Sequence, residues 1–123
     1  MILFNLIELM KHRNFSCKLY EGTVVDATED DTKDKPFDVG PFKEATFFLN
    51  CTVLGGTNVT VKIMVLDPAS LVWHELVSFT VLTAVGKEKK EVTANLGDKI
   101  AVVVTPTGTG STTLTVSANL KIM

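Results

Sequence analysis

The sequence predicts an all-β domain, an antiparallel β-sandwich of about eight short strands. The first observation is that apolar and polar residues alternate at period two over several short segments, as in strands with one buried face. The second is that turn residues, mainly Gly, Pro, Asn and Asp, separate these segments at regular intervals. The short strands favour a sandwich over a closed barrel, and both a jelly-roll and an immunoglobulin-like strand order fit the pattern.

Length and composition describe one ordinary globular domain. The chain has 123 residues, of which 46% are hydrophobic and 21% charged, and its net charge is -2. A chain of this length can bury a core without disulfides or metals. Because it has no basic stripe, we expect no binding of nucleic acid through phosphates. It has no apolar run of membrane-spanning length, so no membrane partner is expected either.

The N-terminal segment 1–15 is predicted to be an apolar arm or short helix outside the sandwich, which spans 16–123. Its apolar residues fit helical spacing and also an extended strand, so both conformations stay open. Such a segment needs a partner, and packing within an assembly is the favoured role. Its positive charges follow the apolar run and no small-residue cleavage site follows, so no signal peptide is expected. The candidate assembly contacts are Leu3, Phe4, Leu6, Ile7 and Met10.

Ser16 to Val25 is predicted as the first strand, with Gly22 as the candidate for a bulge. Asp26 to Pro36 is a charged loop whose five acidic residues suggest calcium binding. The Gly and the Glu that an EF-hand loop requires are absent from their positions, however. We therefore expect a solvated loop, with no metal and no cofactor.

The stretch Glu44 to Phe79 is predicted as three consecutive antiparallel strands joined by two tight turns. Gly55-Gly56-Thr57 forms the first turn and Asp67-Pro68-Ala69-Ser70 the second, after which Trp73 opens the third strand. Apolar residues take the inward positions of the first two strands: Phe47, Leu49, Cys51 and Val53, then Val59, Val61, Ile63 and Val65. The outward positions of the first strand are held by Thr46, Phe48, Asn50 and Thr52.

The C-terminal part of the chain continues the alternation. Thr80 to Val85 is predicted as a short strand, and Lys87 to Glu91 as an exposed edge whose mixed charge discourages edge-to-edge association. Lys99 to Pro106 is predicted as a central strand, followed by a hairpin turn at Gly108 to Gly110. The last strand places Leu114, Val116, Ala118 and Leu120 inward, and Thr113, Thr115, Ser117 and Asn119 outward.

The sequence contains no catalytic constellation, so we expect no enzymatic activity and no catalytic residue. His74 and Glu75 are neighbours in a predicted strand, where adjacent side chains point to opposite faces, so the pair forms no site. Neither Ser70 nor Ser78 lies in a Gly-x-Ser-x-Gly elbow. The glycine pairs lie in predicted hairpins rather than between a strand and a helix, which excludes a phosphate-binding loop.

The two cysteines, Cys17 and Cys51, set no disulfide framework, although they could pair if their strands were neighbours. Cys51 shares an inward face with apolar residues. We therefore expect a buried free thiol that behaves as a small hydrophobic side chain.

Two aromatic residues are candidates for ligand binding. Trp73 is the only tryptophan and could stack on a sugar ring, with Tyr20 as a second stacking residue. The competing interpretation makes Trp73 a core anchor that closes the hairpin. Both interpretations stay open at this point.

Between Phe37 and Leu120 the sequence carries an "ATFFL" strand, a Gly-Thr turn with a Val/Thr-rich strand, an Asp-Pro turn leading to Trp73, a "LGDKIAVVVT" strand and a "GTGSTTLTVS" hairpin. In these features it resembles small β-sandwich structural proteins encoded in the head and tail gene regions of tailed phages and prophages. Such proteins serve as capsid decoration, head-fibre or minor tail components. The resemblance implies no catalytic residues.

The favoured hypothesis is a non-enzymatic virion structural protein that self-associates and docks on the particle. The resemblance implies a homo-oligomer, for which it suggests a trimer, and the major capsid or a tail protein as partner. It also implies a location in the virion after synthesis in the host cytoplasm. One alternative is a carbohydrate- or surface-binding module that uses Trp73 and Tyr20. Another is a filament subunit that donates its N-terminal segment as a strand.

Overall fold

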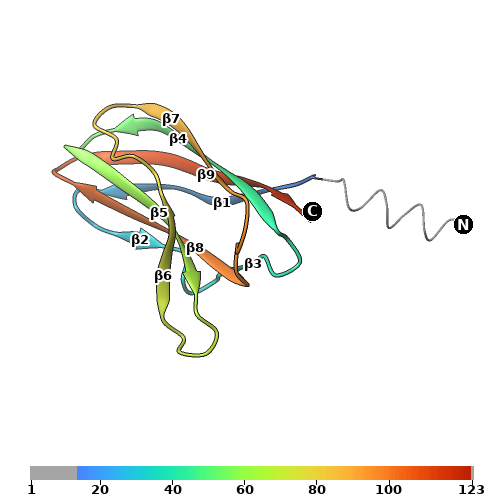
Figure 1. The fold of residues 1–123 in the computed structure, drawn as a ribbon. Coiled ribbons are helices and arrows are strands. Elements are labelled where there is room, and N and C mark those ends of the chain that lie inside the picture. Colours follow the sequence, from blue (N-terminus) through green and yellow to red (C-terminus); the bar gives the residue numbers. More distant parts are fainter. Residues whose placement is uncertain (1–13, 123) are drawn as a thin grey trace, which may run out of the picture.

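The protein is a two-layer β-sandwich in a computed structural model that describes residues 14–122 (Figure 1). The strands that pair do so in antiparallel fashion, which confirms the predicted fold class. The strands are β1 (Asn14–Val25), β2 (Asp30–Asp31), β3 (Phe37–Asp38), β4 (Glu44–Leu54), β5 (Asn58–Leu66), β6 (Trp73–Ser78), β7 (Gly86–Val92), β8 (Lys99–Thr107) and β9 (Ser111–Lys121). A helix long and apolar enough to cross a membrane is not found among residues 14–122.

The strand order identifies the sandwich as a jelly roll. One sheet has four strands in the order β1-β9-β4-β7, and the other has the order β2-β8-β5-β6, with β3 also paired to β8. The antiparallel pairs are nested along the chain: β1 with β9, β2 and β3 with β8, β4 with β7, and β5 with β6. A chain that folds back on itself in this way and then rolls up gives the two Greek keys of a jelly roll. The immunoglobulin-like alternative is therefore excluded.

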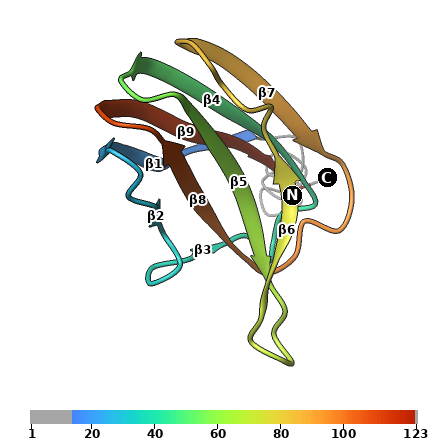
Figure 2. The same cartoon turned by 90° about the vertical axis from the view of Figure 1, so that its left-hand side faces the viewer.

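The predicted turn at Gly55-Gly56-Thr57 is not a hairpin, because β4 and β5 belong to different sheets. The connection from β8 to β9 through Gly108 to Gly110 also crosses between the sheets (Figure 2). The two crossovers pack backbone against backbone: a Cβ on Gly55 would lie 2.4 Å from the carbonyl oxygen of Ser111. Glycine permits this approach, and Gly110 also has a φ of 119°, which side chains disfavour. Only the connection from β5 to β6 remains a hairpin as predicted.

The core lies between the inner faces of the two sheets. The inward rows predicted for β4, β5 and β9 are buried, apart from the ends of β4 and β5. Strand β8 is central, as predicted, and its five residues from Ile100 to Val104 are all buried. The largest fully buried side chains are Phe47, Leu49, Ile63, Leu96, Ile100 and Leu114, with six valines, Val39, Val59, Val61, Val102, Val104 and Val116.

Two bulges change the predicted faces. The register of β4 against β9 shifts between Cys51 and Val53, so Val53 is exposed instead of inward. In β1 the register shifts between Lys18 and Tyr20, not at Gly22 as predicted. A bulge adds one residue to the alternation, and the following side chains therefore change sides.

Two predicted boundaries also differ from the structure. Strand β1 begins at Asn14, so Asn14 and Phe15 belong to the sandwich rather than to the N-terminal arm. The segment Thr80 to Val85 forms a single bridge, between Leu82 and Val59, instead of a strand. The charged segment that follows is the edge strand β7, as predicted.

Both cysteines are free thiols. Cys51 is buried among the inward residues of β4, as expected, and Cys17 is half-buried. Burial raises the pKa of both thiols, which keeps them protonated and poorly reactive at neutral pH.

Candidate functional site

The β5–β6 hairpin projects beyond the rest of the sandwich (Figures 1 and 2). Its end, from Asp67 to Trp73, is called the hairpin tip below. Leu71 is 71% exposed and Val72 50% exposed, so two aliphatic side chains face solvent at the tip. Trp73 is half-buried and pairs with Leu66, the last pair of the β5–β6 ladder. The tip therefore combines exposed apolar groups with a position that a partner can reach.

Asp67 holds the hairpin tip in one conformation. Its carboxylate accepts hydrogen bonds from the Ser70 hydroxyl (2.7 Å) and from the Ala69 backbone N–H (3.0 Å). These two bonds, the first above all, lower the pKa of Asp67, so the carboxylate is charged at neutral pH. Its backbone carbonyl also accepts a hydrogen bond from the Leu71 N–H (2.8 Å), and its N–H donates one to the Val72 carbonyl (2.9 Å). A loop ordered in this way loses little conformational freedom when it binds a partner.

The backbone of Leu71 has a left-handed conformation, with φ of 59°. Within residues 14–122, the other two such residues that carry side chains are Asp26 and Asn95, types that adopt this conformation readily. For a residue such as leucine the conformation costs about 1–2 kcal/mol. The fold recovers little of this cost by burying the side chain, which is mostly exposed. Strain at an exposed apolar residue suggests a role outside the fold.

Trp73 and Tyr20, the predicted stacking residues, lie in different environments. Trp73 closes the hairpin, as one interpretation predicted, but its half-exposed ring is not part of the buried core. The ring of Tyr20 is buried in the core, and its hydroxyl donates a hydrogen bond to Asp30 (2.9 Å). Burial and this neighbouring carboxylate raise the pKa of Tyr20. Tyr20 offers no open face to a sugar, contrary to the sequence-based expectation.

The predicted assembly contacts cannot be placed on the sandwich. Leu3, Phe4, Leu6, Ile7 and Met10 lie outside the described residues. Their role stays a prediction.

The inner strands of the four-stranded sheet, β4 and β9, carry mostly hydroxyl and amide groups on their outer side, which is called the polar face below. Strand register places Phe48 between Ser117 of β9 and Lys89 of β7. The Phe48 side chain is 41% exposed although β4 is an inner strand of the sheet. The polar face consists of the outward side chains of β4 and β9: Thr46, Phe48, Asn50, Thr113, Thr115, Ser117 and Asn119.

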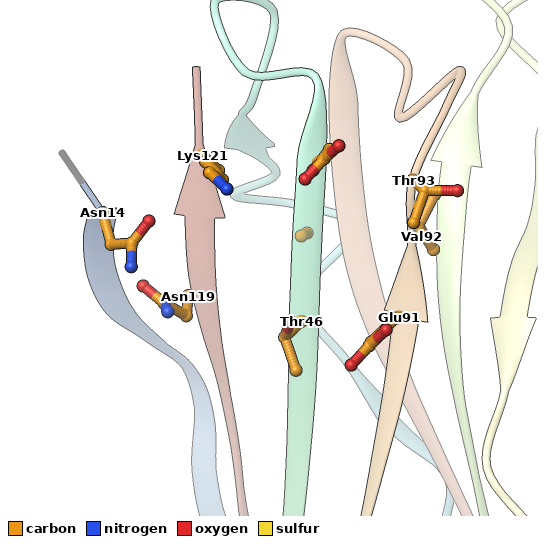
Figure 3. A pocket seen from close by; sticks show the side chains of 9 residues that line it. Asn14, Thr46, Glu91, Val92, Thr93, Asn119 and Lys121 are labelled. Carbon is orange, nitrogen blue, oxygen red and sulfur yellow. The ribbon is translucent and has the colours of Figure 1, made fainter. Parts of the chain in front are cut away.

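A groove of about 270 Å³ crosses one end of the polar face. Figure 3 shows side chains from β1, β9, β4 and β7 that line it. The amide oxygen of Asn119 is buried, and no hydrogen-bond partner for it lies within the described part of the chain. The lining residues are Asn14, Glu44, Ala45, Thr46, Glu91, Val92, Thr93, Asn119 and Lys121.

The carboxylates of the charged loop 26–36 make internal hydrogen bonds. Asp26 accepts the backbone N–H of Gly110 (2.9 Å), which ties the loop to the β8–β9 crossover. Glu29 accepts the hydroxyl of Thr105 (3.0 Å), and Asp30 accepts that of Tyr20. Over residues 14–122, no group of three or more His, Cys, Asp or Glu side chains is arranged to hold a metal ion. These contacts give the acidic residues a structural role in loop placement.

Three residues that are prominent in the structure were not predicted from the sequence as candidate site residues. Phe48 was predicted to face outward. The signal that could have identified it is an aromatic residue at an outward position among polar residues. Leu71 and Val72 follow the predicted Asp67 turn directly, where polar residues are usual. Composition could not show that they lie at the end of a projecting hairpin.

Comparison with known proteins supports the fold and assigns no family. No protein-family model and no curated protein matches the sequence. The solved structure of PBSX exported protein XepA is similar, with a TM-score of 0.63 and 8% identity over 87% of this chain. PNGase F, a glycosylasparaginase from Flavobacterium meningosepticum, has a TM-score of 0.60 and 13% identity over 88% of this chain. The chain spans 37% of XepA and 42% of PNGase F.

A third structure, SPBc2 prophage-derived protein YomS, has a TM-score of 0.49 and 13% identity. The match covers 87% of this chain and 93% of YomS. At these identities the similarities to XepA and PNGase F show the fold alone. The strand order defines the class of this fold as a jelly-roll β-sandwich.

Proposed function

We propose that the protein is a non-enzymatic structural component of a phage or prophage particle, and that it docks on another particle protein through the hairpin tip. Leu71 carries this proposal, because it is exposed, apolar and held in a strained conformation by a rigid loop. The resemblance of Phe37 to Leu120 to phage head and tail proteins supports the particle assignment. The fold shared with PBSX exported protein XepA agrees with it.

The hairpin tip has enough apolar surface for an anchor. Full burial of a leucine or valine side chain contributes about 1.5–3 kcal/mol. Leu71 and Val72 are at least half exposed, and Trp73 is partly so. Together these side chains would contribute a few kcal/mol on docking, which many copies on one particle would amplify through avidity. Self-association of the chain belongs to the same proposal and is supported by the resemblance.

The test compares Leu71→Asn with Val85→Asn. Val85 is also an exposed aliphatic residue, at 59%, but it lies outside the hairpin tip. Asparagine adopts the left-handed conformation readily, so Leu71→Asn should retain or slightly raise the melting temperature. Purified particles of the encoding phage or prophage are mixed with each chain and sedimented.

We expect wild type and Val85→Asn to sediment with the particles, and Leu71→Asn to remain mostly in the supernatant. The proposal fails if Leu71→Asn sediments like wild type, or if the wild-type chain does not associate with the particles.

A further inference from the structure

Phe48 is an aromatic ring in the middle of a hydrogen-bonding surface. Its strand β4 has β9 on one side and β7 on the other, so the ring lies away from the sheet edges. Its cross-strand neighbours on the same face are Ser117 and Lys89. The ring is 41% exposed, whereas the adjacent Phe47 is completely buried on the inner face. The ring therefore presents a flat apolar surface to solvent.

Rows of polar side chains flank this ring along the strands. Neighbouring rows on one face lie about 6.6–6.8 Å apart, two residues along a strand. Toward the groove, the next row contains Asn119, Thr46 and Glu91. A sugar ring matches this arrangement, because its C–H face stacks on an aromatic ring while its hydroxyl groups point sideways to hydrogen-bonding partners.

The groove at the end of the polar face contains an unsatisfied acceptor. The amide oxygen of Asn119 is buried and has no partner within residues 14–122. A buried acceptor without a partner is unfavourable, and rotation of the Asn119 side chain toward the groove would allow a ligand hydroxyl to donate a hydrogen bond to this oxygen. Thr46 and Asn14 line the same groove and can donate or accept further hydrogen bonds (Figure 3).

The outward positions of the four-stranded sheet carry four lysines and three glutamates, so the charges around the polar face nearly balance: Lys18, Lys87, Lys89 and Lys121 against Glu21, Glu44 and Glu91. Lys18 forms an ion pair with Glu21 at 2.6 Å, and Lys89 lies 3.8 Å from Glu91. A surface that binds an anionic polymer would have an excess of positive charge instead. The balance favours a neutral ligand.

We propose that the polar face binds a neutral oligosaccharide, with one sugar ring stacked on Phe48 and the next ring hydrogen-bonded to Asn119 in the groove. This site lies on the four-stranded sheet, whereas the hairpin tip belongs to the other sheet. Sugar binding is therefore independent of the proposed docking. A particle protein with both surfaces would attach through one and contact a glycan through the other.

The test titrates the isotope-labelled full chain with chitohexaose, maltohexaose and cellohexaose and follows amide and aromatic resonances by NMR. We expect shifts at Phe48 and at the side-chain amide of Asn119 for at least one of these sugars. Phe48→Ala should weaken binding about tenfold or more, which corresponds to about 1.4 kcal/mol. Phe48→Leu, which keeps an apolar side chain without a ring, should weaken binding in the same way. The matched control is Phe15→Ala, since Phe15 is 36% exposed and packs against Phe42.

The proposal is overturned if none of the three sugars shifts these resonances. It is also overturned if Phe48→Ala and Phe48→Leu bind as well as wild type, or if the shifts gather at Trp73 instead. Leu71→Asn should bind the sugar normally, so a failure of docking and a failure of sugar binding are distinguished.

Discussion

Replacing Phe47 and Phe48 separately by alanine tests the register of the sandwich and the status of the polar face. The two phenylalanines are neighbours in β4, and the strand alternation sends them to opposite faces. Phe47 is completely buried between the sheets, while Phe48 is 41% exposed on the outer face. The same substitution at both positions removes the same atoms from two different environments.

The expected magnitudes differ by a factor of about three, since only Phe47→Ala leaves a cavity. A buried Phe→Ala change costs about 3–5 kcal/mol of the free energy of unfolding. For Phe48 only the covered fraction of the ring loses contacts, and solvent fills the space, so scaling the transfer value of 1.5–3 kcal/mol gives about 1–2 kcal/mol. In a domain of this size 1 kcal/mol shifts the melting temperature by about 3–5 °C. Phe47→Ala should therefore lower it by about 9–25 °C and Phe48→Ala by about 3–10 °C.

Thermal unfolding followed by circular dichroism, with urea unfolding as a second measurement, gives both values. Equal losses for the two variants, or a larger loss for Phe48→Ala, would refute the argument, because a slip of one residue exchanges the two faces. An unchanged slope of the urea transition is the control that both variants unfold from the same compact state.

Three further predictions follow from named contacts. Tyr20 is the only tyrosine, and its raised pKa predicts that the folded protein shows no phenolate absorbance near pH 10, whereas the urea-unfolded chain titrates there. The stabilising contribution of the Tyr20 hydroxyl is present below pH 10 and is lost as the pH rises through the higher pKa of the folded protein. A phenolate at pH 10 in the folded protein would contradict the burial of Tyr20. Gly55→Ala should lower the free energy of unfolding by about 1–3 kcal/mol, because the added Cβ would lie 2.4 Å from the backbone of Ser111. Gly86→Ala, whose Cβ would have its nearest neighbour at 3.8 Å, should lower it much less in the same urea assay. Cys51 should react with a thiol reagent much more slowly in the folded chain than in urea, and equal rates would show that the thiol is not buried.

Alternation in the sequence was sufficient to predict the long strands and most of the core, but not the short strands β2 and β3. The inward rows of β4, β5 and β9 follow directly from a period of two. The pairing of strands into sheets was not predictable, because Gly55-Gly56-Thr57 has the composition of a hairpin turn and also of a crossover between sheets. Which one forms depends on β8 and β9, which lie far along the chain.

The candidate site depends on features that composition does not encode. The bulge between Lys18 and Tyr20 turns both Leu19 and Tyr20 inward. Tyr20 therefore packs in the core, whereas the alternation in the sequence had left it available for stacking on a ligand. The outward position of Phe48 was predicted, but its place on an inner strand came from the pairing with β7 and β9. The left-handed backbone of Leu71 is a property of the folded loop and has no sequence signal of its own.

The measurement that tests the central claim most directly is fluorine NMR of the chain with 5-fluorotryptophan at its single tryptophan, Trp73. Because only this chain carries fluorine, tryptophans of the particle do not contribute to the spectrum. Trp73 directly follows Leu71 and Val72 at the hairpin tip and is partly exposed. Docking on a large particle through any surface broadens the resonance, whereas docking through the tip predicts in addition that its chemical shift changes as particles are added below the concentration of the chain. Broadening without a change of chemical shift, from chain that sediments with the particles, would show that docking uses another surface.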